Sequence, residues 1–470
     1  MIISSSVASS QPNNDYGVII DAGSSGSRVF VYYWRHREDT TTLPDAFPLD
    51  TNGLSQTKPN PNSLVLNKIF ITDALQVGSS AKADGGLANV PLEKIEEYLK
   101  PLIDHAKSLV PQKKHSQTPI FLFATAGMRM KTEEEQNATL TKVRSTLQNT
   151  GFRFDNPEKW ACVISGEDEG AFGWVTTNYL KRILVQDNSE KLTVGALDLG
   201  GASLQITFLP EEAPKKEPYH LILPDKDYKL YTHSFLSYGQ DEARKSLYEI
   251  AAEKAKTASG SIPQEIPFPC FLSGYKEQAT LKIDGQEHTL VGTGNYDLCS
   301  EYEVTMLNLN APCETSPCSI DGTYQPKYNG LFYAMSGFYY TADFFGFSSG
   351  EKATRASMFK SKGNEFCAMN WDNAVKQYPK VPEKNLKMYC FTASYIHNIL
   401  TKGFGFGENE DRFYFTKEVY GSELNWALGG LIAQVPMLDN TNGGTLVQPH
   451  FILSLLSILF ITIIPLFGSF

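Results

Sequence analysis

"GVIIDAGSSGSRVFVYYW", residues 17–34, places a turn of small residues between two apolar runs. The first run ends at Asp21, six small residues from Ala22 to Ser27 follow, and the second run begins after Arg28. Valine, isoleucine and aromatic residues dominate both runs, a composition typical of strands, so we expect a buried β-hairpin. A carboxylate and a hydroxyl-rich turn between two buried strands indicate that the turn has a function.

A second segment, "TVGALDLGGASLQITFL" (residues 193–209), repeats this pattern. It also reads as an apolar strand, Asp-x-Gly, small residues and an apolar strand, and its Asp198 lies 177 positions after Asp21 (198 − 21). A repeat at this distance is of domain scale, unlike the short period of a solenoid. The sequence therefore predicts two similar lobes that face each other across a cleft, each contributing one turn to a shared site.

The two turns have the composition of phosphate-binding loops. Glycine permits positive φ, so consecutive backbone N–H groups can converge on an anion, and serine hydroxyls add donors. Asp21 and Asp198 would face the same cleft and hold a hydrated divalent cation together with the phosphates. A plain hairpin is the alternative for either turn alone. The candidate phosphate-binding residues are Gly23, Ser24, Ser25, Gly26, Ser27, Gly200, Gly201, Ala202 and Ser203.

Two further motifs follow buried-type strands. "ATAGMR" (124–129) presents Thr125 and Arg129 at a strand end, where the arginine can clamp a phosphate or pair with a carboxylate. "VISGEDEGAFGW" (163–174) places three acidic residues at the start of a predicted helix, where they would also complement the helix dipole. Because hydrolysis of a phosphoanhydride needs a base to take a proton from water, we predict that Glu169 is that base.

Length and charge limit the class of protein. A chain of 470 residues is too long for one ordinary core, and its 41% apolar content is that of a folded protein. The net charge of −10 comes with no cluster of basic residues that could neutralise a run of phosphates. We therefore expect no nucleic-acid partner.

The cysteines indicate an oxidising compartment. Six of the seven cysteines follow residue 269, and Cys313 and Cys318 enclose only four residues, which suits a small disulfide loop. A zinc site is disfavoured because histidines are scarce in this part of the chain. The sequon at Asn137 fits a secretory-pathway glycoprotein.

The last twenty residues, "FILSLLSILFITIIPLFGSF" (451–470), carry no charge. A helix of this length spans roughly 30 Å, enough to cross a bilayer, so we expect attachment to a membrane. A transmembrane helix is favoured, with a lipid anchor signalled by "NTNGG" (440–444) as the alternative. The N-terminus lacks the features of a signal peptide, so we expect a targeting segment upstream of it.

These patterns predict a linear organisation of the chain. We expect a loose segment, a first lobe, a second lobe with disulfide-bearing insertions, a return to the first lobe, a linker and a membrane segment. The predicted ranges are 1–14, 15–170, 171–410, 411–434, 435–450 and 451–470, respectively.

The motifs together resemble the ecto-nucleoside triphosphate diphosphohydrolase family, the membrane apyrases. The chain is most similar to the intracellular Golgi and lysosomal branch, through "SGSRVFVYYW" (25–34), "GTGNYDLC" (292–299) and "DGTYQP" (321–326). Five regions typical of the family occur in order: "DAGSSGSR" (21–28), "ATAGMR" (124–129), "VISGEDEG" (163–170), "LDLGGASLQ" (197–205) and "NWALGG" (425–430).

The resemblance implies an α/β, two-lobed actin-like (ribonuclease H-like) fold with a cleft between the lobes. It implies hydrolysis of the terminal phosphate of nucleoside tri- and diphosphates with Ca²⁺ or Mg²⁺, by direct attack of water. The family's base falls on Glu169, its water-positioning pair on Ser203 and Gln205, and further phosphate contacts on Arg28 and Thr125. Its location would be a membrane, with the catalytic domain in the Golgi or endomembrane lumen or outside the cell.

By the same resemblance, aromatic residues hold the nucleobase, and their positions match Tyr339 and Tyr389, although simple packing would also explain both. The family's disulfides map to Cys270–Cys299, Cys313–Cys318 and Cys367–Cys390, with Cys162 free. Actin-like kinases and exopolyphosphatases are the competing enzymes, but six paired cysteines and "NWALGG" are not expected in them. A binding protein that has lost catalysis is a third possibility, which the intact site residues disfavour.

Overall fold

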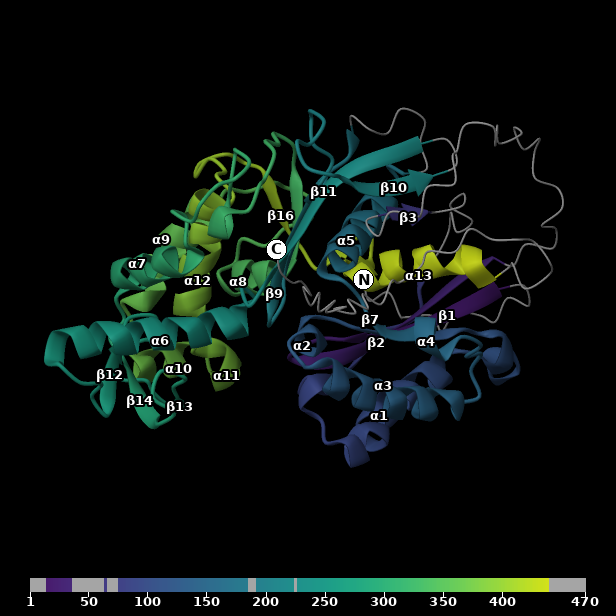
Figure 1. Cartoon of the computed structure of the whole chain (residues 1–470), viewed down its shortest axis with the longest axis horizontal. Helices are drawn as coiled ribbons and strands as arrows, with labels where there is room; N and C mark the ends of the chain where they lie inside the picture. Colours follow the sequence, from purple (N-terminus) through teal and green to yellow (C-terminus); the bar gives the residue numbers. More distant parts are fainter. Residues whose placement is uncertain (1–13, 36–62, 66–74, 185–191, 224–225, 439–470) are drawn as a thin grey trace, which may run out of the picture.

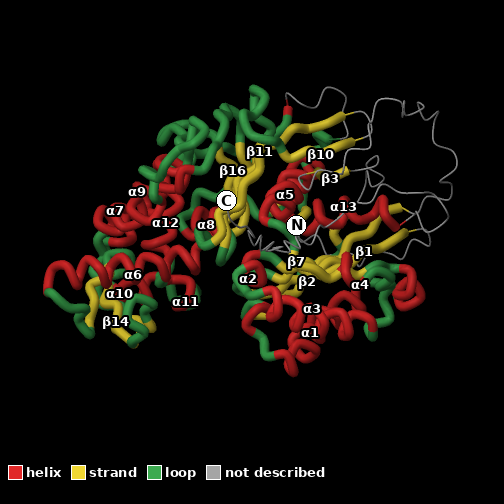
Figure 2. Tube along the Cα trace, viewed as in Figure 1, coloured by secondary structure: helices red, strands yellow, loops and turns green. Residues whose placement is uncertain are grey.

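The computed structural model shows two lobes, each built on its own β-sheet (Figures 1 and 2). One large cluster of buried apolar side chains is centred on the first sheet and a second on the other, with a smaller third cluster beside them. The structure describes residues 14–35, 63–65, 75–184, 192–223 and 226–438.

The first sheet contains the hairpin expected from the opening segment. Strands β1 (Asn14–Ala22) and β2 (Gly26–Arg35) pair antiparallel, with Asp21 opposite Arg28. On the far side of β1, β6 runs parallel to it and β7 runs parallel to β6. Two short strands pair with β2 on its outer edge. The remaining strands of this sheet are β4 (Leu75–Gln76), β5 (Ala81–Asp84), β6 (Ile120–Ala124) and β7 (Ala161–Val163).

The second sheet repeats this topology. Strands β8 (Gly195–Leu199) and β9 (Ser203–Phe208) form the second hairpin, with Asp198 opposite Gln205. An antiparallel strand, β11, flanks β9, and the parallel strands β15 and β16 flank β8. The repeat read from the two Asp-x-Gly segments is thus a repeat of strand order. The other strands are β3 (Ser63–Val65), β10 (Tyr219–Leu223), β11 (Lys226–Leu236), β15 (Phe332–Ser336) and β16 (Phe413–Phe415).

Helices α1 (Ile95–Leu109) and α3 (Glu133–Gln148) cover one face of the first sheet (Figure 1). The buried positions of α1 recur every three to four residues, as expected of a helix with one face on a core. A capping box at Thr132 and Glu135 fixes the start of α3. The short helix α2 (Ala126–Arg129) follows β6, and the short helix α4 (Pro157–Trp160) precedes β7.

The second lobe carries most of the remaining helices and a small three-stranded sheet (Figure 2). All three predicted disulfides are present, Cys270–Cys299, Cys313–Cys318 and Cys367–Cys390, and Cys162 is free, as predicted. The elements of this region are α6 (Gln240–Ser259), β12 (Glu265–Phe268), β13 (Lys276–Thr280), β14 (Glu287–Gly292), α7 (Tyr296–Leu307), α8 (Gly337–Phe344), α9 (Ser357–Cys367), α10 (Trp371–Gln377), α11 (Glu383–Leu386) and α12 (Tyr389–Asn398).

Two helices join the lobes. Helix α5 (Gly166–Leu180) packs on β8, β9 and β11 of the second sheet, and α13 (Trp426–Leu438) packs on β1 of the first. The two helices cross in close contact, because a Cβ on Gly429 would lie 2.1 Å from the Phe172 carbonyl oxygen. The Gly429 amide donates to Thr176 Oγ1 at 2.8 Å.

The chain crosses between lobes at other points than we predicted. The return to the first lobe, expected from residue 411, comes later, because β16 pairs with β15 in the second sheet. The predicted boundary at residue 170 falls inside α5, and β3 joins the second sheet although its sequence lies in the first-lobe range. The loose segment (1–14) and the linker (435–450) lie mostly outside the described residues, and the membrane segment (451–470) lies entirely outside them.

Within the described ranges, none of the helices combines the length and apolarity needed to cross a membrane.

Gly429→Ala is expected to lower the free energy of unfolding by about 3 kcal/mol, because the new methyl group would overlap a backbone carbonyl that cannot move aside. Gly430→Ala is the matched control, since its Cβ would meet only side-chain atoms at 3.3 Å or more. Chemical unfolding of both variants measures the difference. Equal stability of the two would show that the helix crossing is not tight at Gly429.

Candidate functional site

The two Asp-x-Gly turns meet where the lobes join. A Cβ on Gly201 of the second turn would lie 2.5 Å from Ser24 Oγ and 3.6 Å from Ser25 Cβ of the first turn. Ser24 is also enclosed from its own lobe, because a Cβ on Gly86 would lie 2.0 Å from the Ser24 carbonyl oxygen. The facing arrangement predicted from the repeat is therefore present, and the glycines are what allow it.

Asp21 and Asp198 each carry a buried carboxylate oxygen that the described part of the chain leaves unpaired. The Oδ1 atom of each has no hydrogen-bond partner among the described residues. Burial raises the pKa of Asp21 to about 8, with the Glu169 carboxylate adding to the shift and Arg28 opposing it. Burial also raises the pKa of Asp198, against a hydrogen bond from Ser336. Two buried, oxygen-bearing groups of this kind fit a divalent cation, which would stabilise the charged forms.

Glu169 lies in the first turn of α5 and is 8% exposed. Its Oε2 accepts hydrogen bonds from Arg129 Nη2 at 2.8 Å and from Gln205 Nε2 at 3.0 Å. Burial raises the pKa of Glu169 to about 7, although Arg129 opposes the shift. Of the two roles considered for Arg129, the observed contact is the one with a carboxylate. A carboxyl group with a pKa near neutrality is suited to accept a proton at physiological pH.

Ser203 and Gln205 lie beside Glu169, as predicted. Both side chains are 2% exposed. Ser203 Oγ accepts from Arg129 Nη2 at 3.2 Å and from Gln205 Nε2 at 2.7 Å, which uses both of its lone pairs. The hydroxyl hydrogen of Ser203 is therefore left for another acceptor. The three predicted catalytic residues thus form one cluster with Arg129.

Arg28 and Thr125 lie next to the first turn. The Thr125 amide donates to the carbonyl oxygen of Ala22 at 3.2 Å, which ties the end of β6 to the turn. Arg28 Nη2 donates to the hydroxyl of Tyr340 at 3.2 Å, so this hydrogen bond links β2 of the first lobe to α8 of the second. Sequence reasoning did not select Tyr340.

The two predicted base-binding tyrosines differ in their surroundings. Tyr339 precedes Tyr340 in α8, and the Lys417 ammonium lies 5.9 Å from its ring centroid. Tyr389 stacks on Phe344, with ring centroids 3.7 Å apart and planes 3° apart. Among the described residues, no hydrogen bond or ring contact joins Tyr389 to the two turns. Its role in binding a base stays a prediction.

Ser336 is a further residue that the sequence did not reveal. It ends β15 beside the end of β8, and its φ of 55° with ψ of −123° is a conformation that residues other than glycine rarely adopt. Its hydroxyl donates a hydrogen bond to the Asp198 carboxylate. A serine directly before a glycine at a strand end, in "AMSGFYY" (334–340), is the signal that could have marked it.

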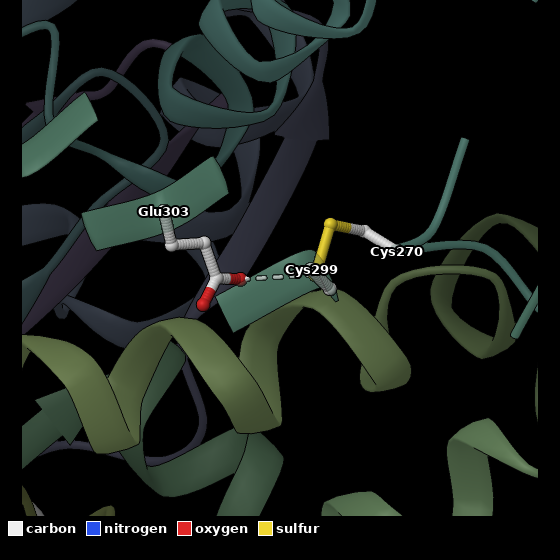
Figure 3. Close-up of side chains that lie close together, drawn as sticks. All are labelled: Cys270, Cys299 and Glu303. Carbon is white, nitrogen blue, oxygen red and sulfur yellow. Dashed lines mark hydrogen bonds between the residues drawn. A yellow bond between two sulfur atoms is a disulfide. The ribbon is translucent and has the colours of Figure 1, made fainter. Parts of the chain in front are cut away.

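One group with metal-ligand chemistry lies elsewhere, at Cys270, Cys299 and Glu303 (Figure 3). The two sulfur atoms are bonded to each other and so cannot act as thiolate ligands. Glu303 Oε2 accepts from Ser394 at 2.6 Å and from Asn398 at 2.7 Å, and burial raises its pKa well above the usual value. These three residues therefore have a structural role in the buried cluster of the second lobe, where the disulfide and the hydrogen bonds to Glu303 use their polar groups.

A model of the GDA1/CD39 (nucleoside phosphatase) family matches residues 7–446. The chain belongs to this family. Among its relatives, mouse ectonucleoside triphosphate diphosphohydrolase 1 is 30% identical over 91% of this chain and 82% of its own length. Chicken ectonucleoside triphosphate diphosphohydrolase 2 is 31% identical over 93% of this chain and 86% of its own.

A solved structure supports the fold. The crystal structure of nucleoside triphosphate hydrolases from Neospora caninum matches with a TM-score of 0.61 and 14% identity, over 90% of this chain and 93% of that one. This GDA1/CD39 protein is therefore a nucleoside phosphatase with a mixed α/β fold, as the sequence motifs predicted. The predicted closeness to the Golgi and lysosomal branch stays a prediction.

Ser336→Gly is expected to have a free energy of unfolding about 1 kcal/mol above that of Ser336→Ala, because only glycine adopts a φ of 55° without strain. Both variants lose the hydroxyl that bonds to Asp198, so this loss cancels in the comparison. Thermal or chemical unfolding of the two variants measures the difference. A glycine variant no more stable than the alanine variant would show that this backbone conformation carries no strain.

Proposed function

We propose that this protein hydrolyses the terminal phosphate of nucleoside tri- and diphosphates to a monophosphate and inorganic phosphate. Water attacks directly, and Glu169 takes its proton. The observation that carries the proposal is the cluster of Glu169, Arg129, Ser203 and Gln205 beside two facing turns of phosphate-binding composition. Positioning and charge stabilisation supply most of the catalysis in reactions of this kind.

The phosphates are bound by the two turns. Backbone amides and hydroxyls from residue 23 to residue 26 approach them from one lobe, and those from residue 201 to residue 203 from the other. Ser27 is fully buried and its Oγ accepts from the Tyr98 hydroxyl at 3.0 Å, while the Gly200 amide donates to the Ser203 carbonyl oxygen at 3.0 Å, so these two groups support the turns rather than bind phosphate. Arg28 and Thr125 border the first turn and extend the same surface. Contact between Gly201 and Ser24 supports a site that draws on both lobes at once.

Asp21 and Asp198 hold a divalent cation, Ca²⁺ or Mg²⁺, through its water shell. The buried and unpaired oxygens of the two carboxyl groups support this assignment. When bound, the cation neutralises phosphate charge and the charge that develops on the leaving oxygen. It also offsets the repulsion among the three carboxyl groups of Asp21, Asp198 and Glu169.

Two oxygen acceptors orient the attacking water. The hydrogen bonds from Arg129 and Gln205 to Glu169 both end on Oε2, which leaves Oε1 to take the proton. Gln205 Oε1 is buried and has no partner among the described residues, so it can accept the second hydrogen of the water. The Ser203 hydroxyl hydrogen points to the remaining partner, a phosphate oxygen. Glu169 Oε1 and Gln205 Oε1 then bind the attacking water, and the Ser203 hydroxyl binds the phosphate.

The nucleobase packs against Tyr339, with Tyr389 on its other side. We infer a role as a nucleoside diphosphatase acting on UDP and GDP in the secretory pathway, attached to a membrane through residues 451–470. The three disulfides support an oxidising compartment such as the Golgi lumen or the cell exterior. Asn137 of the sequon is exposed on α3 and so is accessible to glycosylation.

Glu169→Gln is expected to lower kcat by about 10²–10⁴-fold with little change in KM, because the amide keeps the shape but cannot accept the proton. The measurement is phosphate release from UDP, GDP, ADP, ATP and CTP with Ca²⁺ or Mg²⁺. UDP and GDP should be the best substrates.

Glu167→Gln is the matched control, since Glu167 precedes the site on the same helical turn and is not bonded to the cluster. It should retain near-wild-type kcat. Wild-type protein that releases no phosphate from any of these nucleotides would refute the proposed function. A Glu169→Gln variant with wild-type kcat would instead refute the assigned base.

Millimolar Ca²⁺ or Mg²⁺ is expected to raise the melting temperature of the protein, by an amount equivalent to about 2.7 kcal/mol at a hundredfold excess over the dissociation constant. Asp198→Asn should abolish the cation-dependent shift. The same variant should melt no lower than wild type without cation, because one of the repelling carboxyl groups is gone. A cation-dependent shift that survives in Asp198→Asn would place the cation elsewhere.

A further inference from the structure

Ser234 lies in β11, a segment to which the sequence analysis assigned no chemistry. Its hydroxyl oxygen is 3.0 Å from Gln205 Nε2 and accepts a hydrogen bond from it. The two residues are direct cross-strand partners in the antiparallel pair β9–β11, so their side chains share one face of the sheet. Ser234 therefore reaches the catalytic cluster from β11, through Gln205.

Gln205 Nε2 has more acceptors than hydrogens. Three oxygens surround it, Ser203 Oγ at 2.7 Å, Glu169 Oε2 at 3.0 Å and Ser234 Oγ at 3.0 Å. An amide nitrogen carries two hydrogens, so the three acceptors share them. The two ends of an amide have the same shape, and only its partners decide which end faces which way. Glu169 as a carboxylate can only accept, and Ser203 Oγ already accepts from Arg129, so Nε2 faces inward and Gln205 Oε1 faces the attacking water, with Ser234 as the third acceptor of Nε2.

The three acceptors are not equivalent during the proposed reaction. Glu169 gains a proton, and a neutral carboxyl group holds an N–H less strongly than a carboxylate does. Ser203 already accepts from Arg129 at 3.2 Å and donates toward the substrate. Ser234 neither changes charge nor contacts Arg129 or substrate. It is the acceptor that stays constant through the cycle.

Gly166 makes room for Ser234. A Cβ at residue 166 would lie 2.3 Å from Ser234 Cβ and 2.4 Å from its Oγ, closer than side chains can approach. The glycine in "VISGEDEG" (163–170) is thus required by a serine almost seventy positions later. Helix α5 carries Glu169, so the same contact sets the distance between the base and β11.

We propose that Ser234 is a positioning residue that fixes the orientation of the Gln205 amide and, through it, the attacking water. The proposal rests on the proposed function, because it assigns Gln205 Oε1 to that water. Loss of the Ser234 hydroxyl would let the amide turn over more often, which lowers the fraction of productive complexes. Substrate binding by the turns would be unaffected.

The test is a double-mutant cycle in the full chain, with phosphate release from UDP as the measurement. Ser234→Ala should lower kcat about fivefold, the effect of losing one neutral hydrogen bond, with KM within twofold of wild type. In a Gln205→Ala background, Ser234→Ala should change kcat by less than 1.5-fold, because the group it acts through is gone.

Thr232→Val is the matched control. Thr232 lies two residues earlier in β11 and faces α5 as well, but its hydroxyl bonds to Thr207 at 2.7 Å rather than to Gln205. It should retain wild-type kcat even where it lowers stability. Should Ser234→Ala fail to fold, Ser234→Cys keeps the volume with a weaker acceptor and should lower kcat in the same background-dependent way.

Unchanged kcat in Ser234→Ala, or an equal loss in both backgrounds, would overturn the proposal, since either result shows that Ser234 does not act through Gln205. A loss in Ser234→Ala matched by Thr232→Val would also overturn it, because any lost hydroxyl on the strand would then have the same effect. Wild-type protein without phosphatase activity would count against the proposed function instead, so the two failures are distinguishable.

Discussion

Buried negative charge at the junction of the lobes is the constraint on which the rest of the structure depends. Asp21, Asp198 and Glu169 come from three different elements. Burial, with a contribution from neighbouring carboxylates, raises the pKa of Asp21 to about 8 and that of Glu169 to about 7. A cluster of buried carboxylates is stable only when nearby positive charge compensates it. Arg129 supplies one positive charge to Glu169. The unpaired Oδ1 atoms of Asp21 and Asp198 are the place where a second positive charge fits.

The arrangement of both lobes follows from holding these carboxyl groups in place. Each aspartate ends the first strand of a hairpin, and each hairpin is the centre of its sheet. Helix α5 brings Glu169 against the second sheet, while its tight crossing with α13 ties that sheet to the first. The strands and helices that carry the three carboxyl groups therefore also hold the two lobes together at the site.

Local sequence was enough to predict the features that repeat or that lie close along the chain. The two Asp-x-Gly turns, the acidic first turn that carries Glu169, and the Cys313–Cys318 loop are all visible in short segments. The cross-lobe contact between Arg28 and Tyr340, separated by 312 positions, is not, because no local pattern fixes which side chains meet there. Ser234 and Ser336 could not be predicted for the same reason. The contact of Ser234 with Gln205 depends on strand register, and the strain at Ser336 depends on a backbone angle.

The order in which the chain visits the two lobes has a mechanical consequence. Strand β1 opens the described chain in the first lobe, and α13 ends it on β1 of that same lobe, so nearly all of the second lobe is an insertion between them. Force applied at β1 would therefore act on the first sheet alone. Force applied at α13 would act on both sheets, because α13 packs on β1 and also on α5, which lies on the second sheet.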